Sequence, residues 1–118
     1  MSDERKWGKP GWNKQNPKGK LIIHNATKEW IPDGMDVKVR IEGVHDTRPF
    51  YTEETISPGQ RIGYQPPNDN ELKIIAKSKV SAMKPITHEI PHPLSREDMQ
   101  INIAAGAKGS ISLLIRRV

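Results

Sequence analysis

The stretch that decides the fold is Met35–Glu42, which reads MDVKVRIE. Its odd-numbered positions are apolar and its even-numbered positions are charged. Successive side chains of a β-strand point to opposite faces, so this pattern predicts a strand with one buried face and one wet face. Residues 72–77 read LKIIAK, and Leu72, Ile74 and Ala76 alternate there with lysines. Two half-buried strands are therefore the starting point of the fold.

Shorter runs of the same character surround these two strands. They cover residues 20–27, 49–56, 61–65, 86–90, 100–105 and 110–118. Turn residues separate them, as in Ser57-Pro58-Gly59-Gln60 and Gly106-Ala107-Lys108-Gly109. Ten prolines argue against long helices, and the only helical signal is one turn over Pro93–Met99. About eight strands at roughly 8–12-residue spacing are typical of a sandwich or barrel.

A single half-buried strand cannot bury its apolar face alone, whereas two sheets packed face to face can. The rhythm of turn, strand, loop and strand over Ile56–Ala76 is similar to that of immunoglobulin-like and transthyretin-like sandwiches. We therefore predict an all-β fold, an antiparallel sandwich of about 7–8 strands of one of these types or a jelly-roll type. The residues predicted to point inward are Leu21, Ile23, Val37, Val39, Ile41, Ile62, Tyr64, Leu72, Ile74, Ile86, Ile90, Ile101, Ile103, Ile111, Leu113 and Ile115.

Residues 1–19 differ from the rest of the chain in composition. They read MSDERKWGKPGWNKQNPKG and contain no apolar period. Such a segment buries too little apolar surface to offset the entropy lost on ordering. We therefore predict a flexible basic tail over residues 1–19 and one sandwich domain over residues 20–118.

The tail also carries most of the positive charge. Residues 1–20 have a net charge of +4, whereas the remainder of the chain has +1. Tryptophans can stack on bases and lysines can neutralise phosphates, so nucleic acid is one candidate partner of the tail. Glycines and prolines interrupt any amphipathic helix there, which argues against a membrane-surface role. The candidate partner-binding residues of the tail are Arg5, Lys6, Trp7, Lys9, Trp12, Lys14 and Lys18.

The sequence contains no pattern typical of catalysis. The absence of cysteine excludes a disulfide scaffold, a thiolate metal site and a cysteine nucleophile. No serine lies in a G-x-S-x-G elbow, and there is no phosphate-binding glycine loop. We therefore expect a protein that is not an enzyme and needs no cofactor.

One group of polar loop residues offers an alternative. If every strand crosses the sandwich, the loops at residues 43–48, 66–70 and 91–98 lie at the same end. That end then gathers His45, Asp46, Asp69 and His92. Imidazoles and carboxylates can hold a divalent cation or a polar ligand. Under this alternative the chain is a small metal- or ligand-binding subunit, or an accessory enzyme subunit.

Two apolar residues are candidates for an interface. Leu114 breaks the alternation of the last run by placing an apolar side chain on its second face, and Trp30 follows the first run. A central position in the sheet, a covering loop, the tail or a neighbouring subunit would each explain Leu114. Tryptophan is enriched at the cores of interfaces.

The leading hypothesis for function is a non-catalytic binding or assembly module. A protein partner or self-assembly is the first expectation, with a β-scaffold that offers an edge or loops and a tail that orders on its partner. The alternative is a structural subunit of a self-assembling particle, such as a shell, capsid or tail protein. No signal peptide and no apolar run of spanning length is visible, so we expect a cytoplasmic location and no integral membrane segment.

Overall fold

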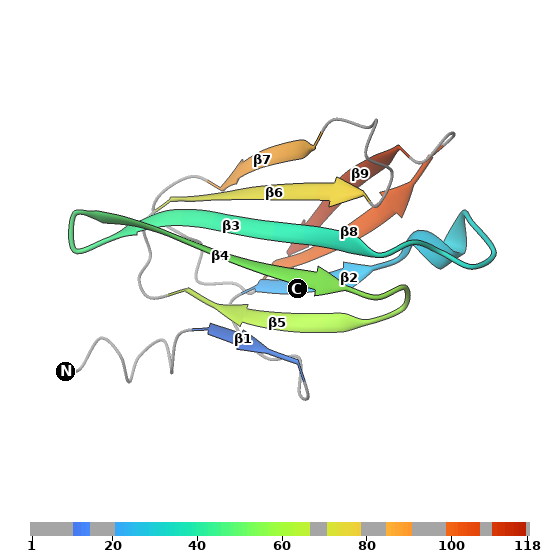
Figure 1. Cartoon of the computed structure of the whole chain (residues 1–118), viewed down its shortest axis with the longest axis horizontal. Helices are drawn as coiled ribbons and strands as arrows, with labels where there is room; N and C mark the ends of the chain where they lie inside the picture. Colours follow the sequence, from blue (N-terminus) through green and yellow to red (C-terminus); the bar gives the residue numbers. More distant parts are fainter. Residues whose placement is uncertain are drawn as a thin grey trace.

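The two expected sheets are present in the computed structural model, which describes residues 11–14, 21–66, 71–78, 85–90, 99–106 and 110–117. Sheet A has the strand order β1-β5-β2-β8-β9, and sheet B has the order β4-β3-β6-β7 (Figure 1). The strands are β1 (Gly11–Asn13), β2 (Leu21–Asn25), β3 (Val37–His45), β4 (Arg48–Ile56), β5 (Arg61–Gln65), β6 (Leu72–Ser78), β7 (Ile86–Ile90), β8 (Met99–Ala105) and β9 (Ile111–Arg117). One short 3₁₀ helix, η1 (Thr27–Glu29), follows β2.

These sheets confirm the all-β sandwich that the sequence predicts. Neighbouring strands in the described ranges pair antiparallel, with one exception. Strands β2 and β8 run parallel, with Leu21 beside Met99 and Asn25 beside Ile103. This parallel pair places the β8–β9 hairpin next to the first core strand of the domain.

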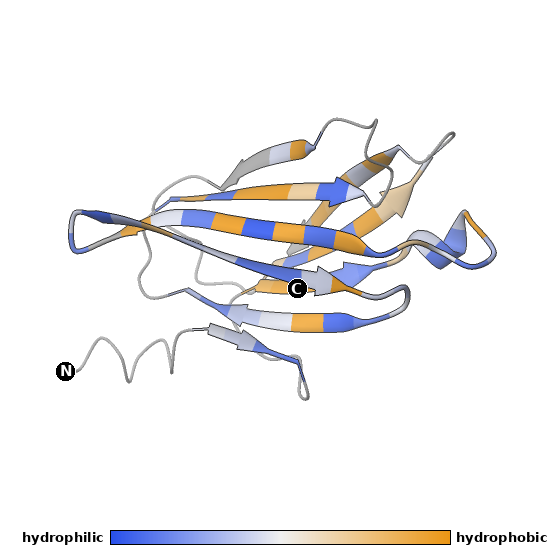
Figure 2. Cartoon of the chain, in the orientation of Figure 1, coloured by the Kyte–Doolittle hydropathy of each residue, from blue (hydrophilic) through white to orange (hydrophobic). Residues whose placement is uncertain are grey.

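The space between the sheets is filled by aliphatic side chains. Alternation along β3 is visible in Figure 2 as a succession of hydrophilic and hydrophobic residues. Of the sixteen residues predicted to point inward, twelve are buried, and Ile86, Leu113 and Ile115 are half-buried at the margin of the core. The side chain of Ile90 lies outside the described set. Ile56 and Ala76 are fully buried as well.

A buried polar network joins the two sheets at one end of the sandwich. The amide Nδ2 of Asn25 donates to the carbonyl oxygens of Met35 at 2.7 Å and Ile56 at 2.8 Å. Its Oδ1 accepts from the backbone N–H and the hydroxyl of Thr27. The Thr27 hydroxyl in turn accepts from the backbone N–H of Met35 at 3.0 Å. A buried amide is stabilising only when its hydrogen bonds are made, so this network fixes β2 against the entry of β3 and the end of β4.

The β3–β4 connection is tighter than the loop over residues 43–48 that the sequence suggested. Strand β3 continues to His45, which pairs with Arg48 at the start of β4. Only Asp46 and Thr47 remain in the turn, and both have positive φ, at 51° and 63°. Two successive residues of positive φ match the twist of the flanking strands in a two-residue hairpin. The hairpin therefore extends the paired strands almost to its tip.

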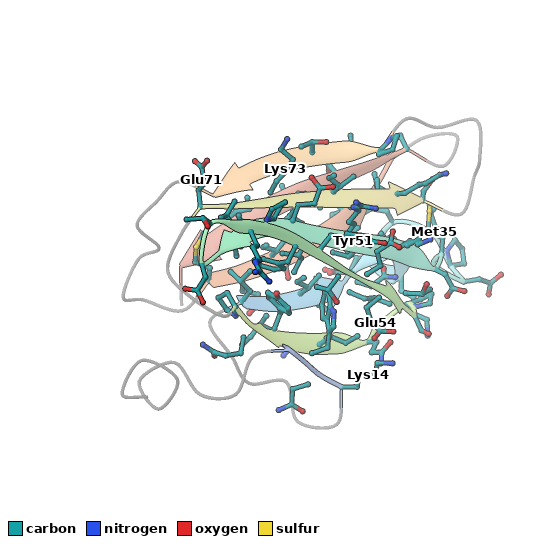
Figure 3. All side chains as sticks on the ribbon, turned by 60° about the vertical axis from the view of Figure 1, so that its left-hand side comes forward. Lys14, Met35, Tyr51, Glu54, Glu71 and Lys73 are labelled. Atoms are coloured by element: carbon teal, nitrogen blue, oxygen red, sulfur yellow. The ribbon has the colours of Figure 1, made fainter. Side chains whose placement is uncertain are left out.

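Residues 11–14 also differ from what the sequence suggested for them. Instead of lying free, they form the short edge strand β1, which pairs with β5 so that Trp12 lies opposite Tyr64. The indole Nε1 of Trp12 donates to the Thr52 hydroxyl of β4 at 2.7 Å, and the Lys14 ammonium lies 2.9 Å from a Glu54 carboxylate oxygen (Figure 3). An aromatic ring and one ion pair supply the contacts that composition alone does not reveal.

Candidate binding groove

The outer face of sheet B carries a groove among the residues that the structure describes. The groove has a volume of about 640 Å³ and lies where β3, β4 and the start of β6 meet. Volumes of this size are typical of sites that hold a small molecule or a few side chains of a partner. Its lining residues are Arg40, Glu42, Gly43, Val44, Pro49, Phe50, Tyr51, Glu71, Leu72 and Lys73.

Tyr51 dominates this surface because its side chain is 60% exposed. The guanidinium carbon of Arg40 lies 3.8 Å from the centre of the Tyr51 ring, which is the geometry of a cation–π contact. Arg40 Nε also donates to a carboxylate oxygen of Glu42 at 2.7 Å. The ring and the guanidinium are thus held in place before any partner arrives.

Gly43 explains how two core side chains come close to the groove from the inner side of the sheet. A Cβ atom at this position would lie 2.8 Å from Leu72 Cδ2 and 2.9 Å from the Phe50 ring, closer than such atoms normally approach. Glycine therefore allows Leu72 and Phe50 to pack against the inner side of the β3 backbone. On the outer side, Val44, which is 40% exposed, adds apolar surface toward the hairpin.

The charges around the groove are balanced. Arg40 and Lys73 contribute two positive side chains, and Glu42 and Glu71 contribute two negative ones. Figure 3 shows Glu71 and Lys73 together at the start of β6. A surface with equal numbers of both charges does not attract a polyanion over long distance, as a nucleic-acid site does.

The structure accounts for two of the seven tail residues that the sequence singled out. Trp12 packs on Tyr64, with ring centres 4.9 Å apart, and Lys14 pairs with Glu54. Both therefore engage the chain's own sandwich in this structure. The others, Arg5, Lys6, Trp7, Lys9 and Lys18, lie outside the described residues.

The polar loop residues predicted to gather at one end of the sandwich lie only in part within the described residues. Strands β3, β5 and β7 finish at the same end of the sandwich in Figure 1, as the alternating loops require. Asp46 is exposed in the hairpin turn, whereas Asp69, His92 and the side chain of His45 lie outside the described set. Among the described side chains, no three histidines or carboxylates gather in a way that could hold a metal ion. The His45, Asp46, Asp69 and His92 site stays a prediction.

The two interface candidates are both exposed. Trp30 is 51% exposed beside η1, and Leu114 is 48% exposed on β9, which is the last strand of sheet A. Leu114 therefore does not occupy a central strand.

Sequence reasoning did not single out Arg40, Tyr51 or Glu42. The useful signal was an aromatic residue at a wet position: in PFYTEETI, Tyr51 falls on the face that otherwise holds Glu53 and Thr55. Tyrosine is enriched at protein interfaces, so an exposed tyrosine on this face makes the surface a candidate for contact.

Comparisons with known proteins do not indicate a function, so the groove is the feature from which a function is inferred. No family model matches the chain, and neither the curated proteins nor the solved structures that were compared with it show a match. Within the described ranges, no helix has the length and apolarity needed to cross a membrane.

Proposed function

We propose that this chain is a non-catalytic binding module that holds a segment of a protein partner in the groove on sheet B. The observation that carries the proposal is the exposed Tyr51 ring with the Arg40 guanidinium stacked on it. Tyrosine and arginine are the residue types that most often supply binding energy at protein interfaces. Both come from long paired strands, so little ordering entropy is lost when a partner binds.

The mixture of apolar surface and charges of both signs in the groove favours a peptide segment over other partners. The exposed Val44 and Tyr51 give the groove apolar surface that can accept an aliphatic or aromatic side chain. The four charged groups at its rim can pair with both charges and with backbone amides of a partner. These features support a protein ligand of mixed character, which agrees with the expectation from sequence that a protein is the first partner class.

A selection experiment with a matched control tests the proposal. A library of random peptides displayed on phage is selected on the wild-type protein, and the affinities of the enriched peptides are measured by calorimetry. We expect Tyr51→Ala to weaken their binding at least about tenfold, which corresponds to about 1.4 kcal/mol. Trp30→Ala, which removes a similarly exposed aromatic ring outside the groove, should leave the affinities unchanged.

The fold of each variant is checked by thermal unfolding before affinities are compared. In the wild type, titration with an enriched peptide should shift the NMR resonances of Arg40, Val44 and Lys73. Peptides that bind the wild type and Tyr51→Ala equally well would refute the groove as the binding site. A selection that enriches no peptide over the Tyr51→Ala protein would count against the proposal in the same way.

A further inference from the structure

Strand β9 forms an edge of sheet A that is poorly protected against pairing with another strand. Edge strands of natural sheets are commonly guarded by charges, prolines or bulges. At the opposite margin of the sandwich, the edge strand β4 of sheet B carries Pro49 and the charged residues Arg48, Glu53 and Glu54. The stretch Ile111–Ile115 on β9 instead reads ISLLI and contains neither a charge nor a proline.

The side chains around this edge are apolar and incompletely covered. Leu113 and Ile115 point inward but are only half-buried, as is Ile86 on β7, which lies across from β9 in the other sheet. Leu114 projects from the outer face and is 48% exposed. The margin of the sandwich between β7 and β9 therefore leaves apolar surface on both faces of one strand.

The sequence of β9 is complementary to itself when two copies run antiparallel. Leu114 is the central residue of Ile111–Arg117, so pairing over the full length of the strand places Leu114 opposite Leu114 of the second copy. Leu113 then faces Ile115, and Ser112 faces Arg116, with no arginine opposite an arginine. Residues directly opposite each other share a face, so both exposed Leu114 side chains become buried against one another.

We propose that two copies of this chain associate through their β9 strands, which pair antiparallel about a two-fold axis at Leu114. The pairing joins the two A sheets into one continuous sheet. It uses the same surface on both copies, so the association closes at a dimer. One strand pair is a small interface, and we expect a dissociation constant in the range of roughly 1–100 μM. The groove at Tyr51 lies on the other sheet, so this inference does not depend on the proposed function.

Cysteine cross-linking tests the register directly, because the chain has no cysteine of its own. Opposite residues of an antiparallel pair have Cα atoms about 4.5–5.5 Å apart, which is within the range that a disulfide spans. Leu114→Cys should therefore form an inter-chain disulfide under glutathione disulfide. Ser112→Cys is the matched control on the same face, since its two copies would lie about 14 Å apart along the strands at ~3.4 Å per residue.

We expect the Leu114→Cys protein to cross-link at least tenfold faster than the Ser112→Cys protein. A mixture of Ser112→Cys and Arg116→Cys should cross-link into a heterodimer. Equal rates for the two single variants, or no disulfide in either, would overturn the proposed register.

Light scattering over a concentration series tests the association itself. The wild type should approach the mass of two 13.3-kDa chains. Leu114→Arg places two like charges opposite each other and should raise the dissociation constant at least tenfold, whereas Thr55→Arg on the exposed face of β4 should leave it unchanged. A wild type that stays monomeric, a mass that grows beyond the dimer, or a dimer that Thr55→Arg disrupts would each contradict the proposal.

Discussion

The two lateral margins of the sandwich are built in opposite ways. At the margin between β1 and β4, strands from different sheets are joined by directional polar contacts, Trp12 to Thr52 and Lys14 to Glu54. At the margin between β7 and β9, the side chains are apolar and half-covered, with Leu113 and Ile115 at the edge of the core. The first margin is closed by the chain's own N-terminal segment, whereas the second leaves apolar surface that a second copy can cover.

This difference shows two ways in which a small sandwich can cover the side chains at its margins. The inner face of β4 carries Thr52 and Glu54, which would be poor neighbours for an aliphatic core. Strand β1 supplies a partner for each of them and covers Tyr64 at the same time. The β7–β9 margin has no polar inner residue of this kind among its described side chains, which are aliphatic and suited to packing against further apolar surface.

The largest expected effect comes from removing the Trp12 indole at the closed margin, which lies between β1 and β4. Trp12→Ala deletes a half-buried ring and leaves the Thr52 hydroxyl without its donor. We expect a loss of about 2–3 kcal/mol in the free energy of unfolding, since burial and a hydrogen bond are lost together. Chemical denaturation followed by circular dichroism measures this change.

Leu114→Ser provides the contrast at the open margin, which lies between β7 and β9. Because Leu114 is exposed in a single chain, its replacement should change the unfolding free energy of the monomer by less than about 0.5 kcal/mol. The measurement is made at a concentration low enough to keep the protein monomeric. Equal losses for Trp12→Ala and Leu114→Ser would show that the two margins are not built differently.

The sequence predicts those features of the two margins that neighbouring residues encode, and it does not predict those that depend on residues far apart in the chain. Alternation along Met35–Glu42 and the shorter runs is a local pattern, and together these runs predict the sandwich and the twelve inward-pointing residues that are buried. A sheet neighbour is not a local property, so the parallel pairing of β2 with β8 could not be inferred from either strand.

The same reasoning explains why β1 and the groove were not predicted. The segment GWNK has no apolar period, and its stability depends on Thr52 and Glu54, some forty residues away in sequence. The groove depends on the register of β3 with β4 and β6 and on the missing side chain of Gly43. Both features arise from tertiary contacts that composition and periodicity do not encode.

A smaller effect is expected from the pH dependence of stability at the closed margin. Burial raises the pKa of the Tyr64 phenol from 10.0 to about 12. Between these values the unfolded chain loses this proton and the folded chain keeps it, so stability present below pH 10 falls as the pH rises toward 12. At pH 11 the loss amounts to about 1.4 kcal/mol for a shift of this size.

Two variants isolate the contribution of Tyr64 from that of other groups that titrate in this range. Tyr64→Phe should flatten the decline in unfolding free energy between pH 10 and pH 11 by about 1 kcal/mol, since part of the loss has already occurred at pH 10. Trp12→Ala should flatten it in part, because a more exposed phenol titrates nearer its ordinary pKa. The pKa itself can be followed by phenolate absorbance. An unchanged decline in Tyr64→Phe would show that burial of this phenol is not its cause.

A further small effect concerns the ion pair that links β1 to β4. Lys14 is 56% exposed and Glu54 is 22% exposed, so solvent screens much of their attraction. A double-mutant cycle with Lys14→Gln and Glu54→Gln should give a coupling energy of about 0.5 kcal/mol that falls as salt is added.

The matched control for this cycle is the pair Lys38–Glu53, which joins neighbouring strands of one sheet at 3.7 Å. Its contact is longer and its acidic partner more exposed, so its coupling energy should be the smaller of the two. If the Lys14–Glu54 coupling proves no larger than that of Lys38–Glu53, the ion pair is incidental. Closure of this margin would then rest on the Trp12 ring alone.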